Sequence, residues 1–172
     1  AFTMLVGRYK HQLMNFAYRY LGDYDESDDV VQEAFIRVFR HREAYQPVAK
    51  FSTWLYTITV NLAKPQLKRR KRLALFSLSR SRGGEEGGDR ELPDERYAAD
   101  REAERSLTQA LIQKALETIS PKYREVVVLC DIQELSYEEI GEITGLNIGT
   151  VKSRLNRGRA KLQVLLQQLA DE

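Results

Sequence analysis

Cysteine is nearly absent from this sequence, since Cys130 is the only one among 172 residues. A single cysteine has no partner for an internal disulfide, so we expect a reducing, cytoplasmic setting. No apolar run approaches the roughly 18 residues of a membrane helix, and no secretory signal core is present. These absences argue against membrane proteins and disulfide-stabilised secreted domains. Because Ala1 already lies within a helical pattern, we expect the natural chain to begin earlier.

Strand patterns and metal-ligand patterns are also missing. Apolar residues recur at spacings of three and four, which is typical of amphipathic helices, and strict alternation is not found. His11, His41 and Cys130 have no metal-ligand spacing, and the first half has no phosphate-binding glycine loop. We therefore expect an all-α protein that has no cofactor or metal and is not an enzyme.

Net charge is only +2, but the charges are segregated along the chain. Lys64 to Arg72 and Lys152 to Lys161 are basic, whereas Glu85 to Glu104 is mostly acidic. One such block is usually a solvated face or a tail. Two basic blocks on separate helices favour a nucleic-acid partner.

A linker divides the chain. The stretch SRSRGGEEGGDRELPDE, from Ser79 to Glu95, is rich in glycine and charge and poor in apolar residues. We expect a helical domain over residues 1–75, a flexible acidic linker over 76–105, and a second helical domain over 106–172. Each half is long enough for a compact unit of three or four helices.

Four helices are predicted in the first half. An apolar stripe from Phe2 to Tyr20 predicts the first, and Gly22 ends it. Ser27 is expected to cap the second helix and Ser52 the third. A further helix over Gln66 to Leu75 continues the third.

The second half predicts a helix-turn-helix. A helix over Ser106 to Ile119 comes first, and the next is opened by Ser120 with Pro121 at its first position. Two shorter helices follow, with a tight joint between them. Their capping and turn residues are Ser136 with Glu139, Gly145, and Asn147, whose helix is expected to reach about Leu169.

A helical wheel divides the last helix into two faces. The apolar side is formed by Ile148, Val151, Leu155, Leu162, Leu165 and Leu169. The polar side, with its flanks, is formed by Thr150, Lys152, Ser153, Arg154, Asn156 and Arg157. Because an α-helix fits the major groove and contacts bases through its first turns, this pattern predicts a DNA-recognition helix. Arg159 and Lys161 are expected to meet phosphate or a protein partner. The alternative is a helical hairpin with a solvated basic face.

Three stretches together resemble a sigma-70 family factor of the extracytoplasmic-function (ECF) group. DDVVQEAFIRVFRH (Asp28 to His41) is similar to the helix that binds core RNA polymerase. FSTWLYTITVNLAK (Phe51 to Lys64) is similar to the helix that melts and recognises the −10 element. LSYEEIGEITGLNIGTVKSRLNRGRAKL (Leu135 to Leu162) is similar to the −35 recognition motif. The resemblance covers most of the chain except the linker.

The resemblance implies a subunit that directs core RNA polymerase to promoters, helps to open them, and is controlled by an anti-sigma factor, in a stress or envelope response. Polymerase would supply the catalytic chemistry. The implied polymerase-binding residues are Asp28, Asp29, Gln32, Glu33, Phe35 and Arg37. The implied −10 contacts, to a single strand, are His41, Trp54, Tyr56, Asn61, Lys64, Lys68 and Arg69, with Arg70 as a further phosphate contact. The −35 duplex would be contacted by the polar face of the last helix.

Departures from the family pattern lead to further expectations. Pro65 removes an amide donor four residues after Asn61, so we expect a kink beside that base-contacting residue. Gly158 stands where the family commonly has alanine, which lowers helix propensity unless it allows close packing. The acidic linker residues are expected either to mimic RNA in the polymerase exit path or to act as a solubilising tether; they are Glu85, Glu86, Asp89 and Glu91. The alternative function is a stand-alone helix-turn-helix repressor or activator.

Overall fold

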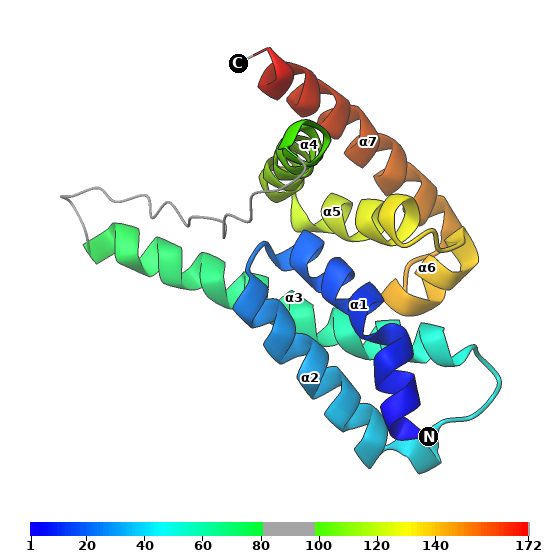
Figure 1. Ribbon diagram of the computed structural model, residues 1–172. Helices are drawn as coiled ribbons and strands as arrows, with labels where there is room; N and C mark the ends of the chain where they lie inside the picture. Colours follow the sequence, from blue (N-terminus) through cyan, green and yellow to red (C-terminus); the bar gives the residue numbers. More distant parts are fainter. Residues whose placement is uncertain (81–98, 172) are drawn as a thin grey trace.

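The computed structural model describes residues 1–80 and 99–171. Within these ranges every regular element is helical, which confirms the expected all-α class (Figure 1). The helices are α1 (Phe2–Leu21), α2 (Tyr24–Arg40), α3 (Phe51–Arg80), α4 (Ala99–Thr118), α5 (Pro121–Val127), α6 (Tyr137–Thr144) and α7 (Ile148–Ala170). A 3-10 turn, η1 (Arg42–Ala44), follows α2, and a π-helical turn, η2 (Val128–Ile132), follows α5. The linker residues Glu85, Glu86, Asp89 and Glu91 lie outside the described residues.

The first half is a three-helix unit in which α1 packs on both α2 and α3. The predicted apolar stripe of α1 is confirmed in its C-terminal part, where Leu13, Phe16 and Tyr20 are buried. Phe16 stacks on Tyr20 and meets the ring of Tyr56 on α3 edge-on, at a centroid distance of 6.1 Å. These contacts join α1 to α3.

The start of α2 differs from the sequence expectation. Gly22 ends α1 in the left-handed conformation, with φ 74°, as predicted. The next residue, Asp23, caps α2 by accepting a hydrogen bond from the Glu26 amide, at 3.0 Å. Ser27 is therefore not the cap. It is buried within the helix and donates to the Asp23 carbonyl. The α1–α2 joint is so short that the first available polar residue after glycine becomes the cap.

Helix α3 is longer and less interrupted than predicted. It begins at Phe51, so Ser52 lies in its first turn and not at its cap. It then continues through Pro65 to Arg80 as one element (Figure 1). Pro65 is exposed and lies inside the helix. Because proline has no amide hydrogen, the carbonyl of Asn61 lacks its usual donor four residues later. The proline therefore does not split the helix.

The helix caps and the turn of the second half agree with the sequence prediction. Ser136 and Glu139 form a reciprocal capping box, with hydrogen bonds of 3.1 Å and 2.9 Å. Gly145 ends α6 at φ 73°, and Asn147 caps α7 by accepting from the Thr150 amide at 2.8 Å. Helix α4 begins at Ala99, earlier than the predicted Ser106. The alanine- and glutamate-rich residues before Ser106 favour helix, which explains the extension.

The two halves pack against each other and share one core. Helix α1 contacts α4 and α5, and α3 contacts α6. A buried arginine of α5, Arg124, joins them. Its guanidinium donates to the Tyr20 carbonyl at the end of α1 (2.7 Å) and to the Glu117 and Ile119 carbonyls at the end of α4 (2.8 and 3.1 Å). These carbonyls lack helical partners, so Arg124 satisfies two helix ends with one side chain.

Helices α5 and α7 approach closely at Gly158. This glycine is buried, and a Cβ atom built on it would lie 2.7 Å from Cγ2 of Val127 and 3.3 Å from Cβ of Tyr123. The close-packing explanation for Gly158 is therefore supported by the structure. Its absent side chain lets the middle of α7 lie against α5.

Replacing Gly158 by alanine is expected to destabilise the protein by about 1–3 kcal/mol, because the added methyl overpacks the α5–α7 contact. Gly7 provides the control, since nothing lies within 4 Å of the position that a Cβ atom would take there. Gly7→Ala should stabilise α1 by up to about 1 kcal/mol. Urea unfolding followed by circular dichroism measures both. Equal effects of the two substitutions would show that α5 and α7 have room to separate.

Candidate nucleic-acid interface

The polar face of α7 is open to solvent over its first turns. Lys152, Ser153, Asn156 and Arg157 are exposed, whereas Thr150 and Arg154 are half-buried. Val151 and Leu155, on the opposite side, are buried in the core. The apolar side thus fixes the helix while the predicted base-contacting side remains available, as major-groove recognition requires.

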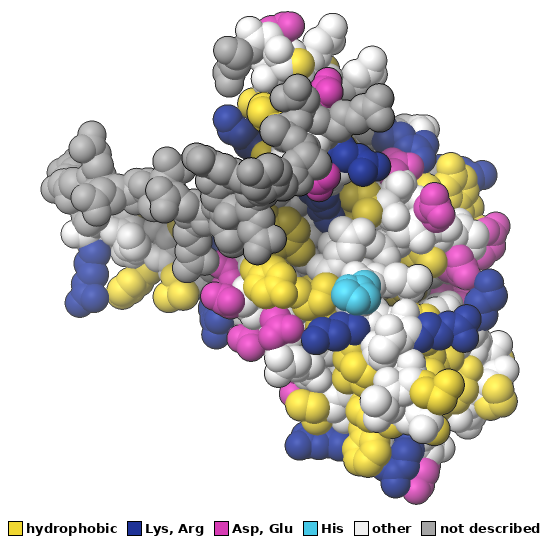
Figure 2. All heavy atoms as spheres, viewed as in Figure 1, with side chains coloured by type: hydrophobic (Ala, Val, Ile, Leu, Met, Phe, Trp, Pro, Cys, Tyr) yellow, Lys and Arg dark blue, Asp and Glu magenta, His cyan; other side chains and the backbone are white. Residues whose placement is uncertain are grey.

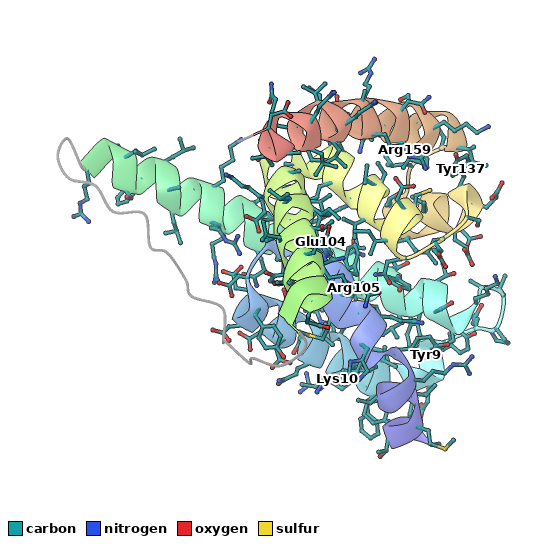
Figure 3. All side chains as sticks on the ribbon, turned by 45° about the horizontal axis from the view of Figure 1, so that its top comes forward. Tyr9, Lys10, Glu104, Arg105, Tyr137 and Arg159 are labelled. Carbon is teal, nitrogen blue, oxygen red and sulfur yellow. The ribbon has the colours of Figure 1, made fainter. Side chains whose placement is uncertain are left out.

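Two side chains of α7 have neighbours that sequence reasoning did not identify. The Lys152 ammonium lies 5.8 Å from the ring centroid of Tyr137. Tyr137, at the start of α6, is labelled in Figure 3. The Arg157 guanidinium lies beside the Tyr123 hydroxyl, and its hydrogen bond lowers the pKa of that tyrosine. Both cations keep exposed side chains, so these contacts orient them without enclosing them.

Arg159 faces another part of the same half. Its guanidinium makes a bidentate ion pair with Asp131 of η2, with Nε donating to Oδ2 at 2.9 Å. This hydrogen bonding raises the pKa of Arg159 above its usual range. The sequence expectation was a phosphate or a protein partner. Within the chain, Arg159 ties α7 to η2, and its contact with a phosphate or a protein partner stays a prediction.

Helix α3 carries most of the predicted −10 residues, and they differ in exposure and in the side of the helix on which they lie. On a wheel of about 100° per residue, Trp54, Asn61 and Lys68 fall within about 40° of one another. Asn61 and Lys68 are exposed, as is Arg69 on the neighbouring edge, and Trp54 is half-buried. Tyr56 lies on another side of the helix, where only 3% of its surface is exposed. The exposed group forms one polar, basic face.

An aromatic cluster lies at the start of this face. The ring of Trp54 stacks on Tyr45, at a centroid distance of 5.2 Å, and Phe51 meets both rings edge-on. The Tyr45 hydroxyl donates to the Ala49 carbonyl at 2.9 Å, which holds the loop before α3 against the cluster. His41, at the C-cap of α2, is exposed. Tyr45 was not singled out from the sequence, although an aromatic residue between the two predicted helices is a usable signal.

Arg70 is occupied by a structural contact. Its guanidinium donates to the Leu21 carbonyl at 2.8 Å and pairs with Glu26. It therefore closes the end of α1 and does not extend the basic face of α3. Exposed cations beside it on this helix are Lys68, Arg69, Lys71 and Arg72.

The predicted polymerase-binding residues of α2 are mostly at the surface. Asp29, Gln32 and Arg37 are exposed, and Asp28 and Glu33 are half-buried. Arg37 pairs with Glu33 at 3.0 Å, one turn earlier. Phe35 differs, because it is 6% exposed and packs edge-on against Phe2. It supports this surface from the core without presenting its own side chain.

Two apolar residues beside this surface were not identified from sequence. Phe39 is 49% exposed, and Ile36 is 43% exposed. Arg42 lies 4.8 Å from the Phe39 ring centroid. Together they place exposed apolar area, including an aromatic ring, next to the acidic residues of α2, and aromatic side chains are enriched in protein interfaces.

Two negative findings apply to the described residues. Residues 1–80 and 99–171 contain no group of three or more His, Cys, Asp or Glu side chains that could hold a metal ion. Among the helices of the same ranges, none has the length and apolar character needed to cross a membrane. On the face seen in Figure 2, basic and acidic side chains are interspersed, in keeping with the small net charge.

An exposed polar recognition helix and a separate basic α3 face define a two-part, helical nucleic-acid-binding protein. Comparison with known families supports this class. The Sigma-70 region 2 model matches residues 5–73, and the Sigma-70, region 4 model matches residues 109–162.

Relatives match along nearly the whole chain. The ECF RNA polymerase sigma factor SigE of Mycolicibacterium smegmatis is 39% identical over 168 residues, covering 98% of this chain and 62% of that protein. The ECF sigma factor SigW of Bacillus subtilis is 37% identical over 177 residues, covering 98% of this chain and 90% of SigW. The chain thus spans less than two thirds of SigE but nearly all of SigW.

Solved structures agree with this assignment. The sigma factor RpoE of Bartonella quintana, in complex with the anti-sigma factor NepR, aligns with a TM-score of 0.72 at 27% identity, covering 96% of each chain. CnrH, in complex with the cytosolic domain of CnrY, aligns with a TM-score of 0.69 at 26% identity, covering 97% of this chain and 88% of CnrH. The chain belongs to the extracytoplasmic-function group of sigma-70 factors.

Arg159→Ala is expected to change −35 duplex affinity less than Arg157→Ala does, although each removes one positive charge from α7. Arg157→Ala should weaken binding by about 1–3 kcal/mol if this side chain contacts a base edge. Arg159→Ala should instead lower stability by up to about 1 kcal/mol, the usual value of a surface ion pair. Fluorescence anisotropy and urea unfolding separate the two effects. Equal losses of affinity would mean that both arginines contact phosphate.

Proposed function

We propose that this chain directs core RNA polymerase to a set of promoters and assists their opening. Its α7 face contacts the −35 duplex, and α3 contacts one strand of the −10 element. Asn61 is the principal base-contacting residue of α3, because its amide both donates and accepts hydrogen bonds. Lys68 and Arg69 hold the strand through phosphates.

The observation that supports this proposal is the presence of two separate polar, basic surfaces that are open to solvent, one on α3 and one on α7. A capped recognition helix in the second half presents Lys152, Ser153, Asn156 and Arg157. An exposed amide with flanking cations, Asn61 with Lys68 and Arg69, lies in the first half. A stand-alone repressor has no need for the second surface, because it binds duplex DNA without opening it.

The acidic surface of α2, with Asp28, Asp29, Gln32, Glu33 and Arg37, is the proposed site for core polymerase. An anti-sigma factor is the proposed regulator, since the similar sigma factor RpoE was solved in complex with the anti-sigma factor NepR. We assign residues 1–75 as the domain that binds polymerase and the −10 element, residues 76–105 as the linker, and residues 106–172 as the domain that binds the −35 element.

No catalytic step is assigned to this chain. Polymerase supplies the nucleotidyl transfer, and the chain contributes binding, positioning and strand capture. Since its partner polymerase and promoter DNA are cytoplasmic in bacteria, we place its action there.

Transcription from a promoter library tests the function. The chain is mixed with core polymerase, and we expect specific start sites that vanish when either component is omitted. Tight duplex binding by the free chain without any transcript would support the repressor alternative and remove the sigma assignment.

Asn61→Ala is expected to slow promoter opening by about 10-fold or more, because the flipped base loses hydrogen bonds worth about 1–3 kcal/mol. The affinity for an isolated −35 duplex should not change. Stopped-flow fluorescence of a base analogue in the −10 element measures opening. Unchanged opening kinetics would assign base recognition to the loop before α3 and not to Asn61.

A further inference from the structure

Three cations surround Tyr123, near the start of α5. The Lys122 ammonium lies 5.0 Å from the centroid of the Tyr123 ring, and the Lys161 ammonium of α7 lies 5.9 Å from it. The guanidinium of Arg157, one turn before Lys161, donates a hydrogen bond to the Tyr123 hydroxyl. Two helices therefore bring three positive charges to one side chain.

These charges are not neutralised by the described part of the chain. In residues 1–80 and 99–171, no carboxylate forms an ion pair with Lys122, Arg157 or Lys161, whereas Arg159 of the same helix is paired with Asp131. All three unpaired cations are exposed. The cluster therefore has the positive charge to attract an anion from outside the chain.

The Tyr123 side chain is held in place between the two helices. It is 9% exposed and lies at the close α5–α7 approach, where its Cβ atom is 3.3 Å from the position that a Cβ atom of Gly158 would take. The hydrogen bond from Arg157 lowers the pKa of Tyr123 against the opposing effect of burial, and the charge of Lys122 lowers it further. Because the hydroxyl oxygen accepts from Arg157, its own proton is available for donation to a ligand.

An open groove gives a ligand access to this cluster. The groove has a volume of about 530 Å³, and its lining includes Tyr123 and Lys161 together with the hydroxyl side chains of Thr118 and Ser120. Both hydroxyl residues are exposed. Cations with hydroxyl donors beside them supply the charge and the hydrogen bonds that phosphate oxygens accept.

The place of the cluster on α7 favours a phosphate of DNA. Arg157 lies on the polar face that carries Ser153 and Asn156, and Lys161 is about 40° from Arg157 on a wheel of about 100° per residue. A recognition helix contacts bases through its N-terminal turns, while residues farther along it reach the sugar-phosphate backbone. A strand that borders the major groove would therefore pass the later turns of α7, beside Lys161 and Tyr123.

We propose that Lys122, Tyr123 and Lys161 form a phosphate clamp, which holds one strand of the −35 duplex beside the recognition face of α7. The two lysines supply positive charge, and the Tyr123 hydroxyl, oriented by Arg157, donates to a phosphate oxygen. The clamp adds affinity but no base preference, which is left to the side chains on the first turns of α7. This inference rests on the proposed function, because it assumes that α7 enters the major groove.

The test compares two double variants that lose the same charge. Lys122→Gln with Lys161→Gln removes the clamp cations, whereas Lys10→Gln with Lys114→Gln removes two exposed lysines from α1 and α4. A third variant, Tyr123→Phe, removes only the hydroxyl and keeps the buried ring. Each protein is titrated by fluorescence anisotropy, at several salt concentrations, against a labelled duplex that the native chain has selected from a random library.

We expect the clamp variant to bind this duplex about 10-fold or more weakly than the control at about 0.1 M salt. The slope of log affinity against log salt should be shallower by about 1.8, since each of two lost phosphate contacts removes about 0.9 for duplex DNA. Tyr123→Phe should weaken binding about 3-fold without a change of slope, because it loses a hydrogen bond and no charge. Each loss should be the same on duplexes with altered bases.

A scan with neutral linkages locates the clamped phosphate. One methylphosphonate replaces each phosphate of the selected duplex in turn, which removes a single negative charge from the strand. The native chain should lose affinity at a short run of positions. The clamp variant should lose little there, because the cations that faced those phosphates are already absent.

Equal affinities and salt slopes of the clamp variant and the control would overturn the clamp, as would a scan in which the native chain and the clamp variant lose the same affinity at every position. Pyrophosphate at constant ionic strength is the second probe. If it binds the native chain but not the clamp variant, and no position in the scan differs, the cluster takes a free phosphate and not a DNA strand. Weaker binding of core polymerase by the clamp variant, with unchanged duplex affinity, would assign the cluster to a protein partner and overturn the clamp as well.

The proposed function is tested separately by transcription of the native chain with core polymerase. Normal transcription together with equal salt slopes would remove only the clamp. A clamp that passes these tests in a chain without promoter-dependent transcription would remove only the proposed function. Failure of the native chain to select any duplex would overturn the clamp, because the free chain would then have no duplex contact at α7.

Discussion

The buried guanidinium of Arg124 is the contact on which the relative placement of the two halves depends. It lies where the C-terminal ends of α1 and α4 meet, and it satisfies carbonyls of both. Burial lowers its pKa, yet three short hydrogen bonds to carbonyls offset part of the cost of burying a charge. Without this side chain, two helix ends would be buried with unpaired acceptors. The hydrogen bonds of Arg124 therefore hold the second half against α1.

Packing of the helices around this contact fixes which side chains α7 and α3 present at the surface. Helix α7 is held in the core by its buried side chains Val151 and Leu155 and by its close approach to α5 at Gly158. Its polar face is therefore directed outward. Helix α3 is fixed by α1 on one side and by α6 on another, which leaves Asn61 and Lys68 exposed while Tyr56 is buried. The same packing that orients the recognition surfaces also brings Glu125 and Glu139 to Lys64 and Lys50.

Local signals in the sequence were sufficient for the helix ends that depend on near neighbours. The capping box at Ser136, the left-handed Gly145 and the Asn147 cap are all found as predicted, because each is made by residues within four positions of one another. Ser27 and Ser52 were wrong as caps for a related reason. Several polar residues stood near each start, and the length of the preceding joint, which a sequence pattern does not reveal, selected among them.

The sequence by itself determined that this chain is helical, that its last helix has one polar and one apolar face, and that two basic blocks lie on separate helices. These properties follow from spacing and charge, which need only a helical period. Only the tertiary structure decided that Arg70 and Arg159 bind within the chain, that Phe35 is buried and Phe39 exposed, and that Lys64 meets Glu125. Those outcomes depend on the packing of whole helices and on residues far apart in the chain, such as Arg70 and Glu26, which are 44 positions apart. A one-dimensional pattern carries no record of which distant side chains will meet.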